Sequence, residues 1–125
     1  MTLEADVSEQ RLRTTLESVL SKIETKFQGE THLQAAAHIQ DGRYGDMALR
    51  LTVNPGLKLS LAKWNGHEFD REIVWGEFSH DQLLLVSEYL QPLVEKLSHQ
   101  QKEKKDKSQS AIDELKKVSS WLDEL

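Results

Sequence analysis

The sequence contains no cysteine among its 125 residues. This absence excludes disulfide bonds, thiolate nucleophiles and cysteine-based zinc sites, and it is compatible with a reducing cytoplasm. The chain also lacks any apolar run near the ~20 residues that a membrane-spanning helix needs. Its first residues, MTLEADVSEQRLR, lack the apolar segment of a signal peptide. We therefore expect a soluble, cytoplasmic protein with no membrane segment.

The chain has no excess of basic residues either, because its formal net charge is −5. A free nucleic acid therefore gains no long-range attraction from the whole molecule, although a local basic patch could still act. Hydrophobic residues make up 38% of the chain and charged residues 30%, which lies outside the disordered class. The length suits one domain with a real core.

Residues 6–27 have apolar side chains at spacings of three and four, which predicts an amphipathic helix. Asp6 and Glu9 fit a capping box at its start, and Gly29 follows its end.

The next fifty residues alternate between apolar and polar side chains, which is the pattern of half-buried strands. Turn residues separate four such runs, and we expect Gly56 to supply a positive φ in the turn Asn54-Pro55-Gly56. The pattern predicts a four-stranded antiparallel meander with strands over residues 31–40, 47–53, 57–64 and 71–78.

A long helix is predicted after the strands, starting at a capping box formed by Ser79 and Gln82. Its broad apolar face suits packing against the sheet. Pro92 lies inside this helix and should kink it near residues 88–92. The fold class is thus α+β, with one domain over residues 1–97.

Residues 98–109 contain no apolar side chain, so they form either a solvated helical extension or a flexible polar spacer. Residues 110–125 predict a short third helix, whose apolar residues follow the four-three spacing of a coiled coil. About two heptads are too short to stand alone in water. We expect this helix to dock on its own domain or on another chain, and the predicted oligomer contacts are Leu115, Val118, Trp121 and Leu122.

We find no motif for catalysis, for a metal or for a cofactor. The five histidines form no HExxH motif and no i,i+4 pair on a helix. His32 and His38 would lie roughly 20 Å apart on one strand, too far to share a metal. Glu68 and Asp70 fall in a hairpin loop without a predicted pocket. We expect a protein that is not an enzyme.

The outward-facing side chains of the predicted sheet are the candidate binding residues. Cations, small alanines and an exposed indole on one face suit stacked bases or an acidic or aromatic partner. The alternative is that the first helix covers this face. The candidate residues for a partner or a nucleic acid are His38, Arg50, Lys58, Trp64, Arg71 and Trp75.

The run LSLAKWNGHEFDREIVW is similar to the central hairpin of positive-cofactor-four-like single-stranded-DNA-binding domains. The resemblance covers residues 57–97, and the residues after the turn are largely acidic where that family has basic ones. It implies a four-stranded sheet followed by a helix, and binding of single strands. The matching residues are Trp64, Asn65, Gly66, Asp70, Ile73 and Trp75.

Three functions follow from these observations. The first is a non-enzymatic adaptor or inhibitor that binds a protein partner, as a homodimer formed through its helices. The second is a single-stranded nucleic-acid-binding protein that uses the outer sheet face. The third is a small enzyme that uses Glu68 or Asp70 with a histidine.

Overall fold

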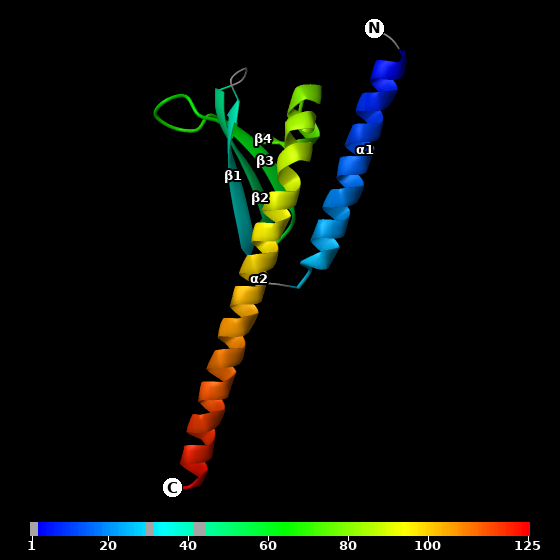
Figure 1. Cartoon of the computed structure of the whole chain (residues 1–125). Coiled ribbons are helices and arrows are strands. Elements are labelled where there is room, and N and C mark those ends of the chain that lie inside the picture. The colour runs from blue at the N-terminus through cyan, green and yellow to red at the C-terminus, as the bar shows by residue number, and fades with distance from the viewer. Residues whose placement is uncertain (1–2, 30–31, 42–44) are drawn as a thin grey trace.

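The computed structural model describes residues 3–29, 32–41 and 45–125. A long helix precedes four strands, and a short 3-10 helix and a second long helix follow them (Figure 1). The predicted α+β class and four-stranded antiparallel sheet are confirmed. The elements are α1 (Leu3–Lys26), β1 (Leu33–Asp41), β2 (Gly45–Val53), β3 (Lys58–Lys63), β4 (Ile73–Val74), η1 (Trp75–Glu77) and α2 (His80–Asp123).

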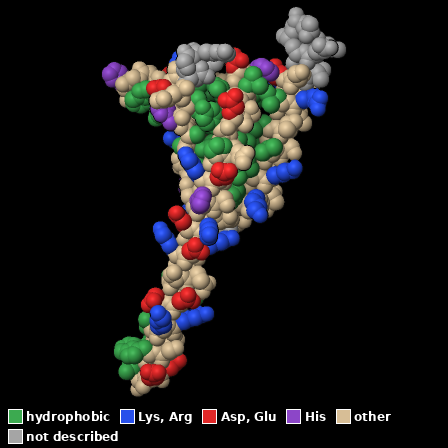
Figure 2. Space-filling model, in the orientation of Figure 1, with side chains coloured by type: hydrophobic (Ala, Val, Ile, Leu, Met, Phe, Trp, Pro, Cys, Tyr) green, Lys and Arg blue, Asp and Glu red, His purple; other side chains and the backbone are tan. Residues whose placement is uncertain are grey.

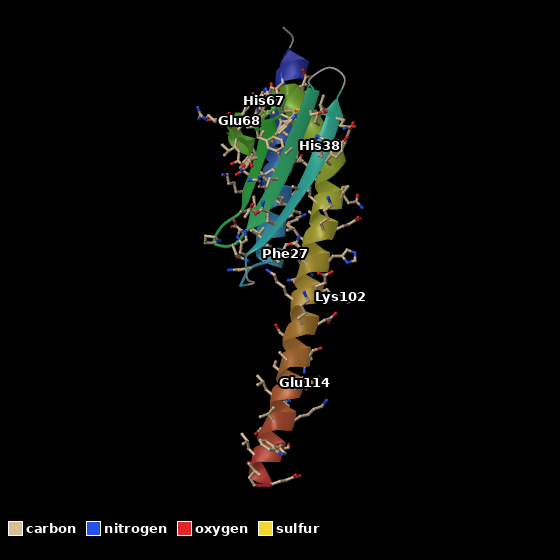
Figure 3. All side chains as sticks on the ribbon, turned by 90° about the vertical axis from the view of Figure 1, so that its left-hand side faces the viewer. Phe27, His38, His67, Glu68, Lys102 and Glu114 are labelled. Atoms are coloured by element: carbon tan, nitrogen blue, oxygen red, sulfur yellow. The ribbon has the colours of Figure 1, made fainter. Side chains whose placement is uncertain are left out.

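The sheet has the order β1-β2-β3-β4, and each neighbouring pair is antiparallel. Strand alternation places one row of apolar side chains on a single face, where they are buried. Both long helices cover this inner face, and Figure 3 shows the sheet in front of them. The first helix therefore does not cover the outer face, so that alternative is wrong. The buried strand residues are Leu33, Ala35, Ile39, Met47, Leu49, Leu51, Val53, Leu59 and Leu61.

Helix α1 adds a stripe of four buried side chains to this core: Leu16, Leu20, Ile23 and Phe27. The helix begins at Leu3, so Asp6 lies within it and is not the predicted N-terminal cap. Glu9 instead pairs with Arg13, one turn later, at 3.1 Å. Arg13 also donates to the backbone carbonyl of Phe78, which joins α1 to the start of α2.

The turn between β2 and β3 differs from its prediction. Asn54, not Gly56, has the positive φ, at 59°, a conformation that asparagine tolerates better than most residues. The Asn54 side chain donates to the carbonyl oxygen of Phe27 at 3.0 Å. Near the same turn, the backbone N–H of Leu57 donates to Glu24 at 3.2 Å. The turn is therefore tied to α1 by polar contacts.

The fourth strand is shorter than the predicted residues 71–78, because the chain leaves the sheet at Trp75. The 3-10 helix η1 turns the backbone toward the helices. Phe78 is consequently fully buried in the core. Burial of this aromatic ring favours the turn over two more strand pairs.

Helix α2 begins at the predicted capping box. The backbone N–H of Gln82 donates to the Ser79 hydroxyl at 3.2 Å, and the Ser79 N–H donates to the Gln82 side chain at 2.8 Å. The helix continues through the exposed Pro92, and the kink there stays a prediction. Its buried residues recur at spacings of three and four and face the sheet: Leu83, Val86, Leu90, Leu93 and Leu97.

Residues 98–109 are helical, which is the first of the two alternatives given for them. The predicted third helix is not separate, because Ser110 lies within α2. We call residues 98–125 the stalk, since no residue after Leu97 is buried. At 1.5 Å per residue its helical part is about 40 Å long. It projects away from the body of the protein (Figure 1).

Candidate functional site

Neither long helix packs against the outer face of the sheet (Figure 3), which is exposed along β1 and partly exposed along β2, whereas Ser60 and Ala62 of β3 are buried. We define the outer face by the outward-pointing residues of β1, β2 and β3. They include His38 and Arg50, and several of the others have small side chains. Three of its residues are alanines, whose small side chains would let a partner approach the strand backbone closely. The outer-face residues are Gln34, Ala36, His38, Ala48, Arg50, Thr52, Lys58, Ser60 and Ala62.

Glu72 occupies the centre of the charged part of this face. Its carboxylate lies 2.8 Å from Lys58 Nζ and 3.1 Å from Arg50 Nη1. The hydrogen bond from Lys58 lowers the pKa of Glu72, and the positive charges of Lys58 and Arg50 add to this effect. Both predicted cations are therefore already paired with a carboxylate. The outer face is not a simple basic patch.

Trp64 lies at the end of β3, and 37% of its surface is exposed. Its ring packs edge to face against Phe69, with the ring centroids 5.0 Å apart. The hairpin loop is wider than the two-residue Asn-Gly turn, because Trp64 pairs with Phe69. Asn65 orders this loop, since its side-chain oxygen accepts the backbone N–H groups of His67 and Glu68, each at 3.0 Å.

Two other candidate residues lie away from the outer face. Arg71 lines a cavity of about 340 Å³ on the helix side of the sheet, where Leu61, Ile73 and Gln82 also line it. Trp75 is half-buried against the core. The structure therefore brings His38, Arg50, Lys58 and Trp64 to one face, and it does not bring Arg71 or Trp75 there.

The carboxylates considered for catalysis lie at the hairpin tip, where Figure 3 shows Glu68 projecting from the body. Asp70 accepts a hydrogen bond from the Asn65 side-chain amide at 3.2 Å. Among residues 3–29, 32–41 and 45–125, no group of three histidine or carboxylate side chains is placed to hold a metal ion.

The free edge of β1 is covered by polar side chains, a feature that the sequence interpretation missed. The Gln34 N–H donates to Gln100 Oε1 at 3.3 Å, and Gln100 Nε2 donates to the Gln34 carbonyl at 2.6 Å. These contacts protect an edge that could otherwise pair with another strand. The sequence signal for these contacts is the spacing of about one helical turn between Lys96, Gln100 and Lys104. The first two bond the β1 backbone, and Lys104 donates to the carbonyl of His32 just before β1.

The stalk carries a row of exposed apolar side chains, and Figure 2 shows hydrophobic side chains gathered near its C-terminal end. We call this row the stalk seam. Its larger members are 49 to 84% exposed, and Ile112 and Trp121 flank it. No described residue of the chain covers it. The seam consists of Ala111, Leu115, Val118, Leu122 and Leu125.

A second apolar surface lies between α1 and α2. Two adjoining hollows of about 620 and 180 Å³ share Val19, Ser87 and Leu90 in their walls. We call them together the helix groove. Its other lining residues are Leu12, Thr15, Leu16, Lys22, Ile23, Lys26, Phe27, Leu83, Gln91, Val94 and Ser98.

In the part of the chain that the structure describes, neither long helix has an apolar stretch sufficient to cross a bilayer. No family model matches this sequence, and comparison with curated proteins and with solved structures gives no match. Functional inference therefore depends on the surfaces described above.

Proposed function

We propose that this protein is a non-enzymatic, cytoplasmic binding protein of the adaptor or inhibitor type. It acts through protein–protein contacts and forms a homodimer through its stalk. The observation that carries the proposal is the stalk seam, whose large apolar side chains are exposed on a part of α2 that the other described residues leave uncovered.

The physical reason is the cost of exposing apolar surface to water. Burying a leucine or valine side chain contributes roughly 1.5–3 kcal/mol. A monomer forgoes this gain at Leu115, Val118 and Leu122, which are about half or more exposed. Contiguous apolar surface of this kind marks protein interaction sites. A dimer leaves the outer face of each sheet open to a further protein partner, which the protein would block or bridge.

The test is the mass of the protein in solution, by size exclusion with light scattering. The chain should elute at twice 14.4 kDa. The double variant Leu115→Lys and Val118→Lys should elute at the mass of one chain, because buried lysines cannot be accommodated in an apolar contact. Ser120→Lys is the matched control, since it lies on the stalk opposite the seam and should leave the dimer intact. A double variant that keeps the dimer mass would refute the contact.

A second candidate function is the binding of single-stranded nucleic acid by the outer face. The observation that favours it is the open face with Trp64 and Phe69 exposed beside it, and the resemblance of residues 57–97 to single-stranded-DNA-binding domains points the same way. The pairing of Glu72 with both cations opposes it.

This candidate is tested by titrating a fluorescent oligothymidylate at low salt. Trp64→Ala should weaken binding by ~1–3 kcal/mol, and Trp121→Ala, on the stalk, should not change it. Glu72→Gln should strengthen binding and steepen its salt dependence, because it frees two cations for phosphates. Absence of binding at low salt would end this candidate.

A further inference from the structure

The helix groove and the stalk seam are two unpartnered apolar surfaces of one chain. The helix α2 runs unbroken from His80 to Asp123, so the stalk leads away from the body and cannot return to its own groove (Figure 1). We propose that the groove of each chain receives the stalk of a second copy, antiparallel, in a reciprocal dimer. This inference rests on the self-association proposed above and names the surface that receives the stalk.

The two surfaces match in length. The groove follows α2 from Leu83 to Ser98, which is about 24 Å at 1.5 Å per residue. The seam from Ala111 to Leu125 is about 22 Å long by the same rise. One stalk therefore fills one groove from end to end.

The surfaces also lie on one heptad pattern. Continuing the four-three spacing of the seam back along α2 reaches Val94, Leu90 and Ser87, which all line the groove. Residues with this spacing stay on the contact face of a left-handed supercoil. Between the stalk seam and the groove the same spacing passes Lys104 and the buried Leu97, so the partner helix would meet this face of α2 in two separate stretches.

Antiparallel pairing of this heptad fixes a register. The two kinds of contact position in the repeat face each other when Leu90 lies opposite Leu115 of the second copy. Ser87 then lies opposite Val118 of the second copy. In the same register Val94 lies opposite Ala111 of the second copy, so the three groove residues on this face all meet residues of the stalk seam. A shift by one heptad, which would place Leu125 of the second copy opposite Ser87, would leave Leu83 at the end of the groove with no seam residue opposite it.

The charges at the groove are consistent with this occupant. Lys22 and Lys26 line the groove on the α1 side. In the proposed register, Glu114 of the second copy reaches the level of Gln91, which lines the same hollow. The final fifteen residues carry four acidic and two basic side chains, so their net charge is opposite to that of the groove.

The register is tested by disulfide trapping. Only introduced cysteines can form a disulfide, because the chain has no cysteine of its own. The double variant Ser87→Cys with Val118→Cys should form covalent dimers under mild oxidation, seen on a non-reducing gel. Each single variant should remain a single chain. Ser87→Cys with Leu125→Cys, which matches the register shifted by one heptad, should link at least tenfold more slowly.

Two outcomes would overturn the proposal. Efficient linking of Val118→Cys alone would show stalk-to-stalk pairing, and a double variant that is dimeric in solution yet does not link would exclude the groove. A monomeric mass for the unmodified chain would instead refute self-association itself.

A charge inside the groove gives an independent check without oxidation. Val19→Lys should weaken dimerisation at least tenfold, because Val19 lines both hollows and is 36% exposed, so the change does not disturb the core. Thr14→Lys, elsewhere on α1, is the control and should leave the dissociation constant unchanged. An unaltered constant for Val19→Lys would contradict docking in the groove.

Discussion

The two halves of α2 have the same apolar spacing and opposite surroundings. In residues 80–97 most of the large apolar side chains at this spacing face the sheet, and Val86, Leu93 and Leu97 are fully buried. In the stalk the seam is bare, and Leu115 is 67% exposed. Periodicity identifies which face of a helix is apolar, and the rest of the fold decides what covers that face. A bare seam on an otherwise packed helix points to a contact outside the chain.

The largest loss of stability should come from substitutions in the buried half of α2, residues 80–97. Leu93→Ala should lower the free energy of unfolding by ~2–5 kcal/mol, because the site is fully buried and leaves a cavity. Leu122→Ala in the stalk should lower stability only through dimerisation. Denaturant unfolding at several protein concentrations separates the two, since the Leu93 loss should not depend on concentration and the Leu122 loss should. Equal losses of stability for both variants, independent of protein concentration, would contradict the difference between the buried half of α2 and the stalk.

The second effect concerns where the helix starts. Ser79→Ala should cost ~0.5–2 kcal/mol, since Ser79 caps α2. Ser110→Ala should cost nothing measurable, because Ser110 lies inside the continuous helix, where alanine is the better helix former. Thermal or denaturant unfolding measures both. A similar loss at Ser110 would indicate that a separate helix starts there, as the sequence alone predicts.

A third, smaller effect is expected where the two halves meet. Gln100→Ala removes two hydrogen bonds to the Gln34 backbone and should speed exchange of the Gln34 amide proton, with a net cost of about 1 kcal/mol. Gln109→Ala is the control, because the Gln109 side chain donates to Asp113 of its own helix. Hydrogen exchange by NMR reports both, and an unchanged Gln34 amide would contradict the capped edge.

The smallest effect is expected on the exposed outer face, where polar contacts are partly solvated. Glu72→Gln should cost under ~1 kcal/mol at pH 7. The pKa of Glu72 is lowered in the folded protein, chiefly by the hydrogen bond from Lys58, so its contribution exists above the ordinary value of 4.5 and is lost as the pH falls below it. The stability difference between the two proteins should shrink between pH 5 and pH 3. A stability difference that grows over this pH range would contradict the stabilising pairing of Glu72 with Lys58 and Arg50.

Sequence patterns sufficed for the elements whose apolar period is long and regular. The helix over residues 6–27, the three longer strands and the Ser79 cap all lie close to their predicted places. The fourth strand was overestimated, because alternation alone cannot show that Phe78 is turned into the core. Glu72 was missed as a partner of Arg50 and Lys58, since this contact depends on the register between β3 and β4.

The candidate site was partly predictable for the same reason. Strand alternation correctly groups His38, Arg50 and Lys58 on one face. Arg71 was misplaced because the irregular pairing around the hairpin changes which face a residue meets. Neither the position of both helices on the inner face nor the groove between them can be derived from local spacing, because both depend on tertiary packing.

The most direct test of the account is sedimentation equilibrium of the intact chain over a range of concentrations. We expect a monomer–dimer equilibrium that reaches twice 14.4 kDa at high concentration, and a chain ending at residue 109 that sediments as a single chain throughout. A single-chain mass for the intact protein at every concentration, or a dimer that survives loss of residues 110–125, would contradict the account.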